Sequence, residues 1–480
     1  MDSREILPDT TTIRYILDTK SLDSHVAPYS PLERLLHYTW HDDFSFYRTP
    51  EQAHSSELDA ITSLSVDRNP EETDLEISWG DKTLKTSYFP DRHDALATRG
   101  DYTEPQPETD DIALIDIFES LTQLSNECNL DIFITERTSL LRNRYEIEHE
   151  FCKHKRERLH LMSAREAVEF TGIYFRNNNE FKFYPPADSD RPGTYRIGRT
   201  NWCWSLSRLL VPHLSANEYL GSMIDRIESL CVGIDEIGTQ HYRGTGNHTD
   251  IMVRYHFNNC ISLLTGIGDV LALHTRDILD VDVSDRNTNL RVGSNPVLQA
   301  LKEENEDAWL HVQQNHPFIE LLHIFRNDII HQSGVIKRGP GHTVTGDNMV
   351  EWGSHSIWLT TLSEDDREDF KKYYTQLDDS VLPNELMTEW GIITPERESP
   401  TITEHTSIDA YQFTKRAVAE MVEFVDEYLR VLGFPNRIRT LTDNDRGLLR
   451  RHTVETVAGE GLFPLIDDLD PSELSGPVED

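Results

Sequence analysis

The sequence predicts an α+β protein, with an N-terminal mixed α/β domain followed by a mainly helical bundle domain that carries a mixed insertion. Three observations lead to this prediction. The chain has 480 residues, more than one ordinary hydrophobic core contains, so we expect at least two domains. Short apolar runs alternate with helical patterns before residue 205. Beyond it, apolar residues recur at the three- and four-residue spacing of long helices.

Residues 1–110 form an irregular N-terminal region with one β-hairpin near 75–86. The runs 75–79 and 82–86 alternate along the chain, and the Gly-Asp pair between them tolerates the positive φ angles of a two-residue turn. Prolines among acidic residues indicate a linker at 99–110.

Residues 111–205 form a small α/β unit. Ser163 is expected to cap its last helix, because Glu166 stands three residues later in the capping-box position. The expected elements are a helix from 111, a strand at 131–135, a polar helix at 137–157, a strand at 159–162 and a helix at 164–176.

Residues 210–435 form the helical bundle, with a mixed insertion at 335–405. Asp409 caps the last helix, whose apolar stripe extends to Leu432 before Gly433 ends it. The acidic tail 455–480 is expected to be disordered. The other expected helices are 216–236, one whose stripe includes Phe257 and Leu271, 297–314, and one after Pro317.

The charge balance is strongly acidic. There are 84 acidic and 46 basic residues, of which only 11 are lysine, and the formal charge is −38. Acid excess with little lysine is typical of proteins from a high-salt, halophilic cytoplasm, where salt screens the mutual repulsion of carboxylates. The charge therefore indicates habitat more than a binding partner. Any contact with RNA requires a local cluster of arginine and histidine, because there is no global basic field.

Cysteine usage and hydropathy predict a cytoplasmic protein without a cofactor or metal ion. The five cysteines are scattered, with no CxxC pair and no zinc-type spacing. The N-terminus has no apolar segment typical of a signal peptide. No run of about 18 apolar residues exists, so we expect no membrane span.

One Arg-x4-His match is the best candidate site. The pattern occurs four times, and only Arg326…His331 lies in a strongly apolar helix, with Asn327 directly after the arginine. Asn327 and His331 are four residues apart and share a helix face, whereas Arg326 and His331 are about 140° apart around the helix. The other matches are Arg144…His149, Arg208…His213 and Arg243…His248.

The chemistry of this trio suits RNA cleavage without metal. A neutral His331 takes the proton of a ribose 2′-OH or gives one to the leaving oxygen. Arg326 braces the phosphate as charge builds, and Asn327 orients the histidine or the phosphate. The structural alternative is that Arg326 and Asn327 form hydrogen bonds within the bundle, and that His331 caps the last carbonyls of its helix.

The segment Phe318-Ile-Glu-Leu-Leu-His-Ile-Phe-Arg326-Asn327-Asp-Ile-Ile-His331 resembles the R-N-x-x-x-H signature of HEPN domains. The preceding helix, from Val253 to Leu264, is similar to the earlier core helix of such domains. The resemblance covers about 210–435 and implies a helical bundle, dimerisation and metal-independent ribonuclease activity. It implies catalytic roles for Arg326 and His331, with Asn327 as the polar accessory. The insertion 335–405 departs from a minimal HEPN domain.

A second resemblance concerns about 111–176. The segments Asp131-Ile-Phe-Ile-Thr135-Glu136 and Leu159-His-Leu-Met-Ser163-Ala-Arg-Glu166 are similar to the closing half of PIN-like domains. Those nucleases gather acidic residues around Mg²⁺ or Mn²⁺. Glu136 stands where an aspartate is usual, and the remaining acids of such a site are not identified. The structural alternative is an α/β unit without a metal site.

The sequence therefore predicts a HEPN-type protein that acts on RNA, with Arg326 and His331 at the cleft of a homodimer. Two alternatives stay open. One is a non-catalytic interaction or dimerisation module, and the other is a divergent PIN-like, metal-dependent nuclease. The HEPN resemblance also implies an antitoxin or defence partner protein.

Overall fold

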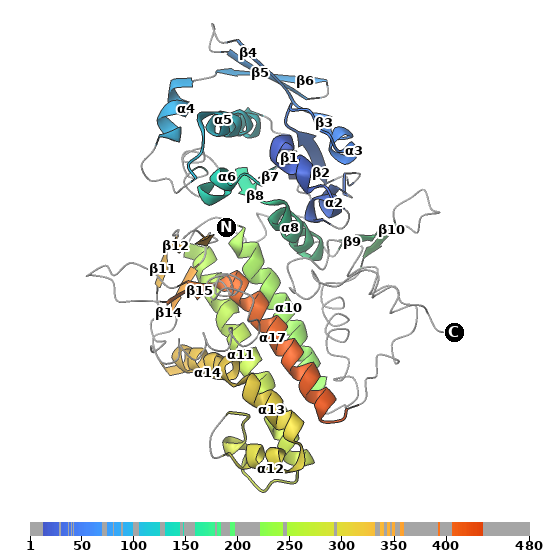
Figure 1. Cartoon of the computed structure of the whole chain (residues 1–480), viewed down its shortest axis with the longest axis vertical. Coiled ribbons are helices and arrows are strands. Elements are labelled where there is room, and N and C mark those ends of the chain that lie inside the picture. The colour runs from blue at the N-terminus through green and yellow to red at the C-terminus, as the bar shows by residue number, and fades with distance from the viewer. Residues whose placement is uncertain are drawn as a thin grey trace, which may run out of the picture. The chain divides into compact units, whose positions relative to one another are not determined.

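A computed structural model of the chain divides into two compact units, residues 1–174 and 175–480 (Figure 1). Strands and helices occur in both units, which confirms the α+β class. The described residues are 13–183 with gaps, of which 99–104, 125–129 and 148–158 are the longest, then 193–196, 221–291 except 243–246, 295–331, six short strands between 337 and 409, and 410–434.

The first unit is built on a five-stranded parallel sheet. Its strand order is β3-β2-β1-β7-β8. From β1 the chain adds β2 and then β3 on one side of the sheet. It then returns to β1 and adds β7 and β8 on the other side, so the strand order reverses between β1 and β7. The strands are β1 (Ile13–Leu17), β2 (Phe44–Arg48), β3 (Thr62–Ser63), β7 (Leu130–Ile134) and β8 (Leu159–Met162).

Both faces of this sheet are buried, as is usual for parallel sheets. The register aligns Ile16 with Phe133 and Phe133 with Leu161, so these side chains share one face. Helix α5 (Thr109–Leu124) packs on that face, where the rings of Phe118 and Phe133 lie 4.6 Å apart. On the other face, the hydroxyl of Tyr15 lies 2.7 Å from that of Thr171 in α8 (Ala164–Asn177).

A small antiparallel sheet completes this core. It consists of β4 (Ser65–Asn69), β5 (Asp74–Trp79) and β6 (Lys82–Ser87). A hairpin joins β5 to β6 at the expected position, with Trp79 paired to Lys82 across a two-residue turn. The buried side chains Leu75, Ile77 and Trp79 belong to the same hydrophobic cluster as Phe118.

The parallel sheet takes strands from both sides of residue 110, where the sequence predicts a boundary between an irregular region and the α/β unit. Its central strand β1 is only five residues long, and all five are buried. Its sequence, Ile-Arg-Tyr-Ile-Leu, places a buried arginine among apolar residues, so neither an alternating nor a continuous apolar pattern identifies it as a buried strand. Helix α8 begins as expected, because Ser163 Oγ accepts from Glu166 N at 3.2 Å and Glu166 Oε2 accepts from Ser163 N at 2.9 Å.

The second unit contains a bundle of long helices. Its main members are α10 (Gly221–His241), α11 (Asn247–Ile278), α14 (His316–His331) and α17 (Ala410–Val431). Helices α10, α11 and α17 pack against one another (Figure 1). Asp409 caps α17 by accepting from Gln412 N at 2.9 Å, and Gly433 follows it with a φ of 85°. Both ends of α17 therefore lie where the sequence predicts them.

The prediction of a single helix at 297–314 is wrong. The chain forms α12 (Pro296–Glu304) and α13 (Glu306–Gln314), separated by Asn305. Asn305 has φ −150° and ψ 87°, and its side chain caps α13 by accepting from Ala308 N at 3.1 Å. An asparagine within a helical pattern can thus end one helix and start the next, because its side chain competes for backbone donors.

Short strands β11 to β15 lie in the insertion, and β16 directly follows it. A four-stranded antiparallel sheet has the order β11-β14-β16-β15, and β12 pairs with β13. The expected tail 455–480 lies outside the described residues. Within the described part of the chain, no helix is both long and apolar enough to cross a membrane. The strands are β11 (Lys337–Gly339), β12 (Thr343–Thr345), β13 (Asn348–Val350), β14 (Ser356–Leu359), β15 (Ile392–Ile393) and β16 (Thr406–Asp409).

Candidate functional site

Helix α14 carries the candidate site on its outer face. The opposite face is apolar, and Phe318, Leu321, Leu322 and Phe325 are at most 2% exposed. The ring of Phe325 lies 5.3 Å from that of Phe413 in α17. This buried face determines the rotation of α14 about its axis, so its polar residues lie on the side away from the core.

Arg326 lies at the edge of this outer face and is held by one ion pair. Its Nη1 donates to Oδ2 of Asp269 in α11 at 3.0 Å. The two side chains are 36% and 39% exposed. Among the described residues, Arg326 makes no other hydrogen bond. Its remaining guanidinium N–H groups can therefore bind a phosphate or carboxylate.

Asn327 and His331 are placed by the same helix. Asn327 is exposed, and His331 is the last residue of α14. The side chain of His331 lies outside the described residues. The structure thus places Arg326 and Asn327 on an accessible face of α14. That the side chain of His331 lies next to them stays a prediction.

A second histidine, His323, lies close to Arg326 on α14, although it is not part of the R-N-x-x-x-H motif. It is three residues before Arg326, so the two share a helix face, and its side chain is partly buried. Burial lowers the pKa of His323, as does the charge of Arg291, while Asp269 raises it. His323 is consequently neutral near pH 7, the form in which an imidazole can accept a proton.

Arg291 adds a second guanidinium to this region. Its Nε donates to Oε1 of Glu320 at 2.7 Å, and its Nη2 donates to Oε2 at 2.6 Å. Glu320 lies on α14 three residues before His323, so this bidentate pair lies on the outer face of α14. Asp269 and Arg291 could not be found from the sequence, because both are remote from Arg326 along the chain. The three-residue spacing of His323 was a local signal that could have identified it.

The other three Arg-x4-His matches form no comparable site among the described residues. Arg144 donates from Nη1 to Oε1 of Glu166 at 2.7 Å, and the side chain of its matching His149 lies outside the described residues. Both residues of the 208/213 match, and the arginine of the 243/248 match, also lie outside them.

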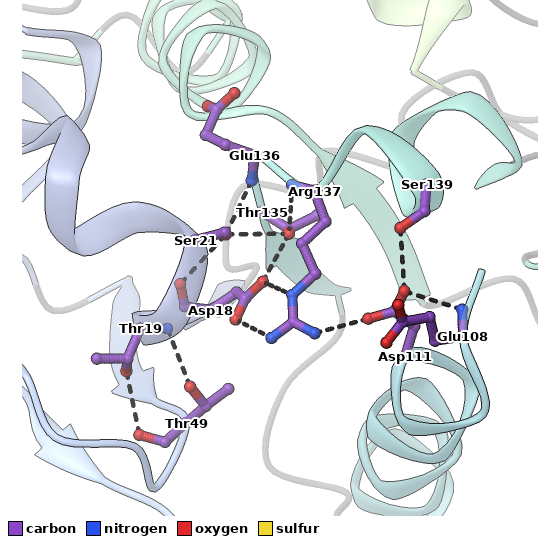
Figure 2. Close-up of polar contacts among 10 residues, drawn as sticks. All are labelled: Asp18, Thr19, Ser21, Thr49, Glu108, Asp111, Thr135, Glu136, Arg137 and Ser139. Atoms are coloured by element: carbon purple, nitrogen blue, oxygen red, sulfur yellow. Dashed lines mark hydrogen bonds and ion pairs between the residues drawn. The ribbon is translucent and has the colours of Figure 1, made fainter. Parts of the chain in front are cut away.

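A second polar cluster lies in the first unit, at the carboxyl ends of β1 and β7, where the strand order reverses (Figure 2). Asp18 directly follows β1 and is 0% exposed. Arg137, which follows β7, donates from Nε to Oδ2 of Asp18 at 2.6 Å and from Nη2 to Oδ1 at 2.8 Å. Thr135 Oγ1 also donates to Oδ2 of Asp18, at 2.7 Å.

The same guanidinium binds a second carboxylate. Arg137 Nη1 donates to Oδ1 of Asp111, in the first turn of α5, at 2.6 Å. Oδ2 of Asp111 accepts from Ser139 Oγ at 3.0 Å and from Glu108 N at 3.1 Å. Burial alone would lower the pKa of Arg137, but its bonds to Asp18 and Asp111 raise that pKa above its usual value. One arginine therefore joins β1 to α5.

These residues do not fit the Mg²⁺ or Mn²⁺ ion that the PIN-like resemblance predicts. Both oxygens of Asp18 and Oδ1 of Asp111 accept from Arg137. Figure 2 shows Glu136 turned away from Arg137, and its Oε1 accepts from Ala164 N at 2.9 Å. Within the described ranges, no three His, Cys, Asp or Glu side chains are grouped so that they could hold a metal ion.

Comparisons with known proteins assign neither unit to a family. No protein-family model matches the chain, and no curated protein or solved structure is significantly similar to it. The HEPN-like and PIN-like resemblances therefore rest on the sequence segments quoted above.

Proposed function

We propose that the helical bundle is a HEPN-type, metal-independent endoribonuclease. Arg326 and His331 are the catalytic pair that the resemblance implies, Asn327 is the polar accessory, and His323 is added in this proposal as the general base. The observation that carries it is the partly exposed guanidinium of Arg326, whose one hydrogen bond to a described residue goes to Asp269. An arginine oriented in this way, with N–H donors left over, is suited to bind a phosphate that gains charge during reaction.

The order of residues along α14 supports a site centred on Arg326. His323 precedes it by three residues and His331 follows it by five, which are axial rises of about 4.5 Å and 7.5 Å. The helix positions of the two histidines therefore lie on either side of Arg326 along the axis of α14. Asn327 is exposed next to Arg326 and provides a further donor and acceptor.

The proposed reaction is an internal transesterification of RNA. The neutral imidazole of His323 accepts the proton of the ribose 2′-OH as its oxygen attacks phosphorus. The bond from phosphorus to the 5′-oxygen breaks, and a protonated His331 donates the proton that this oxygen requires, which leaves His331 neutral. Arg326 stabilises the added negative charge on the phosphate oxygens. The products are a 2′,3′-cyclic phosphate and a 5′-hydroxyl.

Binding of RNA depends on local charge, since the net charge of −38 repels phosphate overall. Arg291 and Arg326 bring two guanidinium groups to the α14 side of the bundle, where each is paired with one carboxylate, that of Glu320 or Asp269. We propose further that a second copy of the chain completes the cleft as a homodimer. An antitoxin or defence protein that covers this face is the partner implied by the resemblance.

Cleavage of RNA in molar KCl with EDTA tests the proposal. We expect the wild type to cleave, with cyclic phosphate ends, and His331→Ala to lose at least about 100-fold in rate. His25→Ala, at an exposed position in the first unit, is the matched control and keeps the wild-type rate. A substrate with 2′-deoxyribose at every position stays intact.

Cleavage by His331→Ala at the wild-type rate, or cleavage of the deoxy substrate, contradicts the proposed chemistry. If neither the wild type nor any variant cleaves RNA, but Arg326→Ala weakens RNA binding, the bundle is a non-catalytic RNA-binding module. If Arg326→Ala changes only self-association, the bundle is an interaction module.

A further inference from the structure

The polar cluster between β1 and β7 lies where open parallel sheets bind their ligands, beyond the carboxyl ends of the strands at the reversal of strand order. In this chain, the place between the two converging carboxylates is taken by Arg137 (Figure 2). Its Nε, Nη1 and Nη2 all donate to Asp18 or Asp111 at 2.6–2.8 Å.

We propose that Arg137 is an internal cation that excludes divalent metal ions from Asp18 and Asp111, and that removing its guanidinium creates a metal site there. This inference is independent of the proposed ribonuclease. A buried carboxylate requires a counter-charge, and Asp18 is completely buried. With Arg137 in place the guanidinium supplies that charge.

The surroundings supply the ligand chemistry of a hard cation once the arginine is gone. Two carboxylates then have unoccupied oxygens, and the hydroxyl groups of Thr135 and Ser139 are within hydrogen-bond distance of them. Mg²⁺ and Mn²⁺ prefer oxygen ligands and complete their shells with water. The site is therefore one substitution away from a cation site that the wild-type chain keeps closed.

Titration with Mn²⁺, followed by electron paramagnetic resonance of the unbound ion, tests this proposal. Molar KCl suppresses non-specific binding by the acidic surface. The variants are Arg137→Gln, Asp18→Asn and the double variant with both changes. We expect Arg137→Gln to bind one Mn²⁺ equivalent more than the wild type, and the double variant to lose that equivalent. Mn²⁺ also raises the melting temperature of Arg137→Gln but not that of the double variant.

Two results overturn the proposal. One is that Arg137→Gln, folded by circular dichroism, binds no more Mn²⁺ than the wild type. The other is that Asp18→Asn binds one equivalent less than the wild type, which means that Asp18 already holds a metal beside Arg137. The second comparison uses wild-type Arg137 throughout, so it decides the question even if Arg137→Gln fails to fold. Equal Mn²⁺ binding by the wild type and Asp18→Asn supports exclusion.

Discussion

The chain uses the same pair of residue types, arginine and aspartate, in two regions and in two different ways. Arg137 is 16% exposed and binds two carboxylates that are 0% and 8% exposed. Arg326 is 36% exposed, and in the part of the chain that the structure describes its one partner is an aspartate that is 39% exposed. A mostly buried guanidinium with all three nitrogens engaged holds elements of the fold together, whereas a more exposed one with further N–H donors can bind a ligand. Exposure and engagement, more than sequence pattern, separate the structural arginine from the functional candidate.

The largest effect expected from this comparison is on the stability of the first unit. Arg137→Gln leaves the carboxylate of Asp18 buried without its counter-charge, which costs about 3–5 kcal/mol. Arg326→Gln breaks an exposed pair and changes the free energy of unfolding by less than about 1 kcal/mol. Urea denaturation in molar KCl, followed by circular dichroism, measures both. Equal losses of unfolding free energy in the two variants contradict the distinction between a structural Arg137 and a functional Arg326.

A second prediction concerns a histidine in the parallel sheet of the first unit, whose protonation makes the stability of the fold depend on pH. Burial, together with the positive charge of Arg144, lowers the pKa of His160 in β8 to about 4. Because this folded-state pKa lies below the ordinary value of 6.5, the unfolded chain takes up the proton first. The stabilisation is therefore present above pH 6.5 and is lost as pH falls toward 4, by about 2–3 kcal/mol.

His160→Asn removes that contribution to the pH dependence. The measurement is the urea midpoint of wild type and variant at several pH values between 7 and 4. Parallel curves for the two proteins show that His160 titrates normally and contradict the expectation.

A smaller effect concerns the helix that presents Asp269 to Arg326. A Cβ added at Gly233 in α10 lies 2.5 Å from Sγ of Cys260 in α11, so Gly233→Ala forces the helices apart. We expect a loss of roughly 1–2 kcal/mol. Gly268→Ala is the control, because a Cβ there meets nothing within 4 Å. It stabilises the helix by about 0.5–1 kcal/mol. A stability loss in the control indicates that α11 packs differently.

Elements that depend on local signals could be predicted from the sequence. The apolar stripe of α17, its cap Asp409 and the stop at Gly433 are all readable within one segment. The same holds for the β5–β6 hairpin and for the capping of α8 by Ser163 and Glu166. In each case the partners are within a few residues, so spacing and residue type determine the geometry.

Contacts between remote segments could not be predicted in this way. Arg326 and Asp269 are 57 residues apart, and Arg137 and Asp18 are 119 apart. Nothing in a single sequence specifies which aspartate among many acidic residues an arginine meets. The candidate Arg326 and Asn327 were therefore found from their motif, while Asp269 and the whole Arg137 cluster required the fold.

The rate of RNA cleavage in EDTA by Arg326→Gln tests the central claim most directly. Arg430→Gln is the matched control, since Arg430 pairs with Glu427 on an exposed part of α17. The account predicts a loss of about 100-fold or more for Arg326→Gln, with unchanged unfolding, and the wild-type rate for Arg430→Gln. Equal rates for both variants, or a loss in Arg326→Gln that only accompanies unfolding, contradict a functional Arg326.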